Sequence, residues 1–196
     1  MTMSTYKSLG GPASGLILTH DAEIAQRLDA IAYPGLTANF DASKSAALAI
    51  SLLDWREYGA AYAQAMIETA QALAQELAAR GLPVFKTASQ AHPYTQSHQF
   101  AVEAVAYGGG QKLAKHLREA NILTCGIGLP IQTVAGDVNG LRLGTNEIAR
   151  WGMHVQHMPT IADFLARVIV QNEDPTSVAA DVTEFRQEFQ EMHFIR

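Results

Sequence analysis

The sequence predicts an α/β fold of no more than two small domains, and three patterns support this class. The apolar run at 15–19 follows a Gly-Gly-Pro turn and is typical of a short strand. Apolar residues recur at intervals of three and four over 59–80, which predicts a long helix with one buried side. Phe100, Val102 and Ala104 recur at period two and predict another strand.

Length and composition fit a globular chain and exclude several functions. The 196 residues are 48% hydrophobic and carry a formal net charge of -5, so a sizeable core is expected and a nucleic-acid surface is not. No run of about 18 apolar residues and no signal-peptide pattern is present, so no membrane contact is expected. The single cysteine, Cys125, excludes an internal disulfide and fits a reducing cytoplasm.

The N-terminal part is expected to hold one strand and one short helix. Residues 1–4 lead directly into the turn that carries Lys7, so no helix or complete strand is expected before it. A helix is predicted over 21–31, with His20 or Asp21 as its N-cap. The Pro34-Gly35 pair then ends it.

Two separate helices are predicted in the middle of the chain. An alanine-rich helix is expected from 43 to 54, ending near Trp55-Arg56-Glu57. The amphipathic helix at 59–80 follows, and Gly81 and Pro83 stop it.

The C-terminal part is predicted to be a compact α/β module. The triglycine at 108–110 precedes a short helix carrying Leu113 and Leu117; it lacks phosphate-loop spacing, so we interpret it as a loop. Strands are predicted at 122–124 and 141–143.

Two helices close the predicted module. Thr160 is expected to cap the first, whose apolar stripe runs over 161–169. The second is expected to begin at Asp174-Pro175, an N-cap followed by proline at the first helical position.

Lys7 is the strongest candidate for a chemical role. It lies among small hydroxylated residues and just before Gly10-Gly11-Pro12, where its amine could reach an aldehyde carbon and form a Schiff base. The alternative is a solvated lysine in a turn near a fraying terminus.

Three ordered segments resemble the serine hydroxymethyltransferase family. Residues 3–12 around Lys7 resemble its lysine segment, residues 32–39 fall at its Phe-Pro-Gly glycine-rich loop, and residues 139–152 around Arg142 resemble its Arg-Val-Gly-Thr segment. The resemblance covers essentially the whole chain but only the C-terminal half of a typical family member. It implies a partial pyridoxal-phosphate-dependent transferase of fold type I, similar to aspartate aminotransferase.

The resemblance also implies a domain organisation. Residues 1–57 would be a remnant of the large cofactor-binding domain, 58–80 an interdomain helix, and 81–196 the C-terminal small α/β domain.

The resemblance assigns roles to five residues. Lys7 is implied as the catalytic residue that binds pyridoxal 5'-phosphate, with Ser4, Tyr6 and Asn39 as further cofactor-binding residues. Arg142 falls at the position that binds the substrate carboxylate, where a guanidinium can make two parallel hydrogen bonds. The alternative for Arg142 is a strand arginine paired with a nearby acid.

The implied activity is the reversible transfer of a hydroxymethyl group from serine, with tetrahydrofolate as co-substrate and glycine as product. Several departures favour a divergent branch that acts on an α-methylated serine and put tetrahydrofolate in doubt: Tyr6 replaces the family's histidine, Ala13 its arginine, and Ala38 and Asn39 two glycines. Arg150 also matches a family arginine and is expected to be structural or on the phosphate side.

Much of the family's machinery precedes the lysine, so we expect this chain alone to be inactive. A homodimer, or association with a missing N-terminal half, is implied. The alternatives are a non-catalytic or split-enzyme assembly subunit and a folate-independent aldolase or aminotransferase of the same fold. No metal site is expected, because His154 and His157 lack an acidic or cysteine partner.

Overall fold

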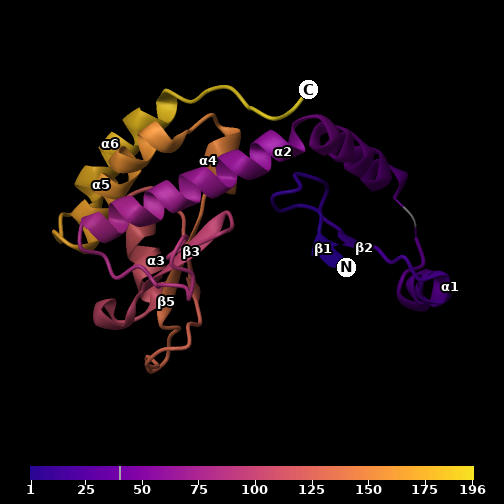
Figure 1. Cartoon of the computed structure of the whole chain (residues 1–196), viewed down its shortest axis with the longest axis horizontal. Helices are drawn as coiled ribbons and strands as arrows, with labels where there is room; N and C mark the ends of the chain where they lie inside the picture. The colour runs from indigo at the N-terminus through magenta and orange to yellow at the C-terminus, as the bar shows by residue number, and fades with distance from the viewer. Residues whose placement is uncertain (40) are drawn as a thin grey trace. The chain divides into compact units, whose positions relative to one another are not determined.

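The computed structural model describes residues 1–39 and 41–196 as two compact units (Figure 1). Unit 1 comprises residues 1–60 and 194–196, and unit 2 comprises residues 61–193. The α/β class is confirmed, since short antiparallel strands and helices make up both units. The predicted division at residues 57 and 80 stays a prediction.

Unit 1 begins with a short hairpin. Strand β1 (Thr2–Ser4) pairs antiparallel with β2 (Gly15–Ile17), so that Met3 lies opposite Leu16. The expectation that no strand precedes the lysine turn was therefore wrong. Three residues are too few to show a period-two pattern, and pairing with β2 is what makes them a strand.

Helix α1 (Ala22–Ala30) follows, and its predicted N-cap is confirmed. The Asp21 side chain accepts a hydrogen bond from the backbone N–H of Ile24 at 2.9 Å. The short segment η1 (Ile31–Leu36) follows and contains the predicted break: its backbone is kinked at Tyr33, which is extended (φ -141°, ψ 126°) just before Pro34. No side chain of α1 or η1 is buried against the described residues.

Helix α2 (Ala42–Ala79) is one continuous helix of 38 residues, so the prediction of two helices was wrong. Gly59 lies in its interior, where glycine costs roughly 1 kcal/mol relative to alanine, too little to end a long helix. A Cβ at Gly59 would lie 2.7 Å from the Trp55 ring. The glycine therefore makes room for that ring.

Unit 2 is built on a three-stranded antiparallel sheet in the order β3-β5-β4. Strands β3 (Gln99–Glu103) and β5 (Gly140–Gly144) confirm the predictions. Strand β4 (Cys125–Ile127) lies three residues beyond the predicted position. The predicted residues, 122–124, form the connection from the end of helix α3, where the Ile122 N–H donates to the Leu117 carbonyl at 3.1 Å.

The helices of unit 2 cover one face of the sheet (Figure 1). Helix α5 begins before Thr160, so that residue is not its cap; His157 is, and Pro159 lies in the first turn. The Asp174 cap of α6 is confirmed. The helical elements of unit 2 that follow α2 are η2 (Val105–Tyr107), α3 (Gly110–Glu119), α4 (Asn146–Arg150), η3 (Val155–His157), α5 (Met158–Ile169) and α6 (Pro175–Gln187).

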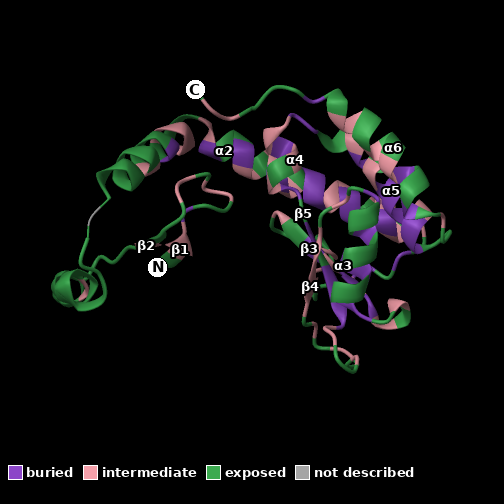
Figure 2. Ribbon diagram, turned by 180° about the vertical axis from the view of Figure 1, so that it is seen from behind, coloured by how far each residue is buried: buried purple, intermediate pink, exposed green. Residues whose placement is uncertain are grey.

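The hydrophobic core lies in unit 2. Figure 2 shows the buried residues gathered on α2, the sheet and the helices around it. Among the described residues, every buried hydrophobic side chain belongs to this unit; those excluded almost completely from solvent include Leu77, Leu117, Leu141, Met158, Leu165 and Val178.

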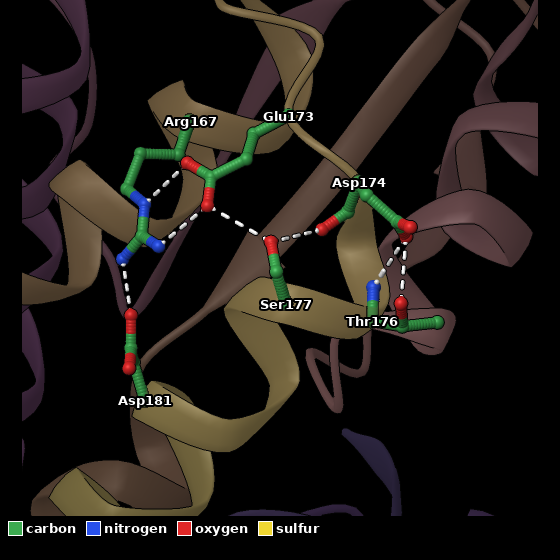
Figure 3. Close-up of polar contacts among 6 residues, drawn as sticks. All are labelled: Arg167, Glu173, Asp174, Thr176, Ser177 and Asp181. Carbon is green, nitrogen blue, oxygen red and sulfur yellow. Dashed lines mark hydrogen bonds and ion pairs between the residues drawn. The ribbon is translucent and has the colours of Figure 1, made fainter.

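A charged network joins α5 to α6 (Figure 3). The Arg167 guanidinium donates two hydrogen bonds of 2.7 Å to Glu173 and one of 2.7 Å to Asp181. Ser177 adds a hydrogen bond of 2.9 Å to Glu173. These bonds to Arg167 and Ser177 lower the pKa of Glu173 to about 2.

Candidate functional site

The candidate lysine lies at the tip of the loop between β1 and β2. Lys7 is exposed, and the N–H of Gly10 donates to its carbonyl at 2.8 Å, which closes a tight turn. No hydrogen bond or ion pair joins the Lys7 amine to the described residues. The amine is therefore accessible on a turn of fixed backbone.

Thr5 holds the two sides of this loop together. It is fully buried, and its Oγ1 lies 2.5 Å from the Pro12 carbonyl oxygen and 2.9 Å from that of Ser14. The Thr5 carbonyl accepts from the Gly11 N–H at 2.7 Å. A Cβ at Gly11 would lie 3.0 Å from that same carbonyl oxygen, so a glycine fits this close approach best.

Helix α2 supports the loop from the side through two side chains that sequence reasoning missed. The Ser51 hydroxyl donates to the Gly10 carbonyl at 3.0 Å, and Trp55 Nε1 donates to the Leu9 carbonyl at 3.0 Å. The available signal was the spacing of Ser51 and Trp55, which are four residues apart and share one face of a helix.

The other predicted cofactor-binding residues also lie in unit 1. Ser4 ends β1 and Tyr6 adjoins Lys7, with 57% of the tyrosine exposed. Asn39 is exposed in the segment between η1 and α2. Ser4 and Tyr6 thus belong to the lysine turn, whereas no hydrogen bond links Asn39 to that turn among the described residues. Their roles stay predictions.

Arg142 occupies the middle of β5, the central strand of the sheet in unit 2. It lies opposite Ala101 of β3 and Cys125 of β4. Its neighbours Leu141 and Leu143 are buried, whereas Arg142 is exposed, so its side chain projects from the face opposite the core. The expected alternative, a pairing with a nearby acid, is absent among the described residues.

Polar residues fix both ends of β5. The Asn139 side chain accepts from the Leu129 N–H at 2.7 Å and donates to three carbonyls of the 129–132 loop. Thr145 is buried, and its Oγ1 donates to the Met66 carbonyl of α2 at 2.7 Å. Arg142 is therefore presented by a strand that is held at each end.

His98 lies next to this strand and is partly buried. Burial, and then the positive charge of Arg142, lower the pKa of His98. Its carbonyl accepts from the Thr145 N–H at 2.9 Å. A neutral imidazole is thus favoured beside the candidate carboxylate-binding arginine.

Arg150 packs within unit 2 as a structural residue. Its guanidinium carbon lies 4.6 Å from the centre of the Tyr62 ring. The Tyr62 hydroxyl in turn donates to the Asn146 carbonyl at 2.8 Å. This contact joins α4 to α2, in line with the structural alternative for Arg150.

The triglycine is explained by packing. Asp137 accepts hydrogen bonds from the N–H groups of Gln111 and Lys112 at 3.0 and 2.9 Å, so the chain's own carboxylate occupies the positive end of α3. A Cβ at Gly109 would lie 2.3 Å from Asp137, and one at Gly110 1.9 Å from the Gly140 carbonyl oxygen. These contacts support the interpretation as a loop.

The histidines and the cysteine form no recognisable metal centre. Within residues 1–39 and 41–196, no group of three or more His, Cys, Asp or Glu could hold a metal ion. The His154 and His157 rings lie 6.1 Å apart, and His157 packs edge-on against Phe189 at 4.9 Å. In the same part of the chain, no helix has the length and apolar character needed to cross a membrane.

A family model described as serine hydroxymethyltransferase matches residues 1–165. The solved structures include a similar fold, the L-threonine transaldolase from Pseudomonas fluorescens in its internal aldimine state. The TM-score is 0.85 at 24% identity, and the match covers 99% of this chain and 44% of the transaldolase. The chain therefore shares the fold of the corresponding part of this transaldolase.

Curated relatives match along the whole chain. This chain is 56% identical over 196 residues to an alpha-methylserine aldolase from Ralstonia sp and 58% identical over 195 residues to one from Variovorax paradoxus. It is 37% identical over 196 residues to a serine hydroxymethyltransferase from Staphylothermus marinus. The chain covers 44%, 43% and 44% of these three proteins, so it spans less than half of their length.

Proposed function

The chain belongs to the serine hydroxymethyltransferase family, and from that membership we propose that it carries the cofactor lysine and the carboxylate-binding arginine of a pyridoxal-phosphate-dependent aldolase. The proposed reaction breaks the Cα–Cβ bond of an α-methylserine-type amino acid. The hydroxymethyl group leaves as formaldehyde, and α-methylserine then leaves alanine behind.

The main support is the state of the two basic side chains. The Lys7 amine and the Arg142 guanidinium are both exposed, and neither is paired with an acid among the described residues. A lysine that forms a covalent bond with an aldehyde needs a free amine, and an arginine that binds a substrate needs an unoccupied guanidinium. Both residues fit the cofactor and the substrate that the family implies.

Each residue has a distinct proposed task. Lys7 would hold the cofactor covalently, with Ser4, Tyr6 and Asn39 as further contacts. Bound pyridoxal phosphate supplies an electron sink for the carbon–carbon cleavage. Arg142 would bind the substrate carboxylate through two parallel hydrogen bonds and so fix which bond at Cα is oriented for cleavage.

We propose aldol cleavage in preference to transfer to tetrahydrofolate. The relatives that share 56–59% of residues are named aldolases, whereas the serine hydroxymethyltransferases share 37–38%. The departures at Tyr6, Ala13 and Ala38 agree with this preference. Transfer to tetrahydrofolate remains the second candidate and would require that co-substrate for turnover.

The proposal is tested in a chimera, because the chain spans less than half the length of its relatives. This chain replaces the matching C-terminal part of the Variovorax paradoxus aldolase, and formaldehyde release from α-methylserine is measured with and without tetrahydrofolate. We expect formaldehyde to be released without tetrahydrofolate. The release should be lost in the variants Lys7→Ala and Arg142→Ala and kept in Lys44→Ala. Dependence on tetrahydrofolate would contradict the aldolase proposal and support the transferase.

We also propose that unit 1 associates with protein, either a second copy or a polypeptide carrying the remaining family length. It carries many of the large apolar side chains that are exposed, including Ile17, Leu18, Ile24, Ile31, Tyr33, Leu36 and Ile50. Sedimentation of the chain, alone and mixed with the corresponding N-terminal part of the relative, tests this. Leu36→Asp should weaken the assembly and Leu123→Asp should not, although both leucines are 81% exposed; equal effects would contradict it.

A further inference from the structure

Unit 2 contains a cavity of about 340 Å³ between the sheet and helices α4, α5 and α6. Its walls are mainly aromatic and aliphatic, and include Ile122, Leu143, Trp151, Phe164, Val182 and Phe185. A volume of this size is at the lower end of small-molecule sites and suits one aromatic ring with a short substituent.

The cavity lies on the opposite face of the sheet from Arg142. Cys125 is paired with Arg142, so the same antiparallel register, continued by one residue, places Thr124 opposite Leu143. Leu143 is 6% exposed and faces the core, and side chains alternate between the two faces of a strand. Thr124 and Leu143 both line the cavity, which is thus separate from the candidate substrate arginine.

One polar atom at this cavity has no partner. The Thr124 hydroxyl oxygen is buried, and no hydrogen bond joins it to any described residue. A buried hydroxyl without a hydrogen bond costs free energy, and such atoms are rare in folded proteins. Thr124 is therefore positioned to accept or donate one hydrogen bond to an occupant.

The other polar residues of the walls are engaged or exposed. Asn121 donates to the Thr183 hydroxyl at 3.0 Å. The Arg186 guanidinium lies 4.4 Å from the centre of the Trp151 ring and also donates to the Phe189 carbonyl. Glu147 is exposed, and its carboxylate together with the Arg186 guanidinium gives the walls one negative and one positive charge, so they favour neither an anion nor a cation. A neutral molecule with a single hydrogen-bonding group satisfies these conditions.

The aromatic walls favour a ring. Phe164 and Phe185 meet edge to face, with ring centres 5.8 Å apart and planes at 68°, which is the arrangement that aromatic groups prefer. Leu123 also lines the cavity and is 81% exposed, so the cavity meets solvent there and an occupant has a route of entry.

We propose that this cavity binds a small neutral aromatic molecule that carries one hydroxyl group, with the ring among the apolar side chains and the hydroxyl on Thr124. The site is separate from the proposed aldolase chemistry and does not depend on it.

The test is titration calorimetry of the full 196-residue chain with phenol and with toluene, which has a similar shape but no hydroxyl. One hydrogen bond is worth roughly a tenfold difference in affinity, so phenol should bind about tenfold more tightly than toluene. In Thr124→Val this preference should disappear or reverse, because the phenol hydroxyl would then lose its hydrogen bonds to water without gaining a partner. Val182→Phe should fill the cavity and abolish binding of both, whereas Val170→Phe, at an exposed position on the same unit, should leave them unchanged.

Three results would overturn the proposal. The first is the absence of saturable phenol binding, which is expected if water alone occupies the cavity. The second is an unchanged phenol affinity in Thr124→Val, and the third is unchanged binding in Val182→Phe. Circular dichroism checks that each variant is folded, and Ile161→Phe, another wall position, replaces Val182→Phe if that variant unfolds.

Discussion

The two units of this chain are stabilised in different ways. In unit 2, β3 and β5 pack their leucine, valine and phenylalanine side chains against α2 and the C-terminal helices. In the described part of unit 1, the buried side chains are instead polar and small: Thr5 and Ser51 bind backbone carbonyls of the lysine loop, while large apolar residues such as Leu36 stay exposed.

This difference bears on the two candidate residues. Arg142 lies on a strand whose opposite face is anchored in a core, so its position is fixed by packing. Lys7 lies on a loop that is fixed by hydrogen bonds to carbonyl oxygens. Since water competes with each of those bonds, we expect the lysine loop to open more readily than the arginine strand.

Removal of a core side chain should have the largest effect. Leu141 is fully buried in the central strand of unit 2, so Leu141→Ala should lower the free energy of unfolding by about 2–5 kcal/mol. Leu36→Ala removes the same atoms from a side chain that is 81% exposed in unit 1 and should change it by less than about 0.5 kcal/mol. Urea unfolding of both variants measures the contrast, and similar losses would show that Leu36 is buried in solution.

The next largest effect is expected at Thr5. Thr5→Val keeps the shape but removes the hydroxyl that lies between the Pro12 and Ser14 carbonyls, and should cost about 1–3 kcal/mol of local stability. Hydrogen exchange of the Gly11 amide, which donates to the Thr5 carbonyl, should accelerate. Thr37→Val, at an exposed threonine of the same unit, is the control; equal exchange in the two variants would refute the anchoring role.

The sequence predicted helix ends well where local hydrogen bonds decide, and predicted elements less well where tertiary contacts decide. The caps at Asp21 and Asp174 rest on local hydrogen bonds and were predicted correctly. The continuity of α2 was missed, because Gly59 looks like a helix break and is instead required by the Trp55 ring. Strand β1 was missed because its pairing partner lies beyond the lysine loop.

The candidate site was predictable in its chemistry but not in its support. Lys7 and Arg142 were singled out from sequence motifs, and the structure shows both side chains exposed, but their roles stay predictions. Ser51 and Trp55 lie more than 40 positions after the loop that they hold; their spacing of four places them on one helix face but does not indicate which segment that face contacts. The expected N-cap role of Thr160 was wrong for a local reason: α5 begins at Met158, with Pro159 in its first turn.

Trp55 offers a finer test of the same loop. Trp55→Phe keeps an aromatic ring on α2 but removes the Nε1 donor to the Leu9 carbonyl, which should cost about 0.5–1.5 kcal/mol. Hydrogen exchange of the Gly10 amide should accelerate in Trp55→Phe. This acceleration should be smaller than that of the Gly11 amide in Thr5→Val. Trp151→Phe makes the same change in unit 2 and should leave the loop unaffected; acceleration there would point to a general loss of stability.

The smallest effect should appear only at low pH, in the network of Figure 3. The pKa of Glu173 is lowered from 4.5 to about 2 in the folded chain, so folding favours its charged form. The resulting stabilisation is fully present above pH 4.5 and is lost as the pH falls toward about 2. Glu173→Gln should therefore flatten the dependence of the melting temperature on pH across this window, and Glu184→Gln in helix α6 should not. Because the Glu173 carboxylate is partly accessible to solvent, the difference should be small and should shrink further in high salt; an equally steep profile in Glu173→Gln would show that the network adds nothing to the stability of unit 2.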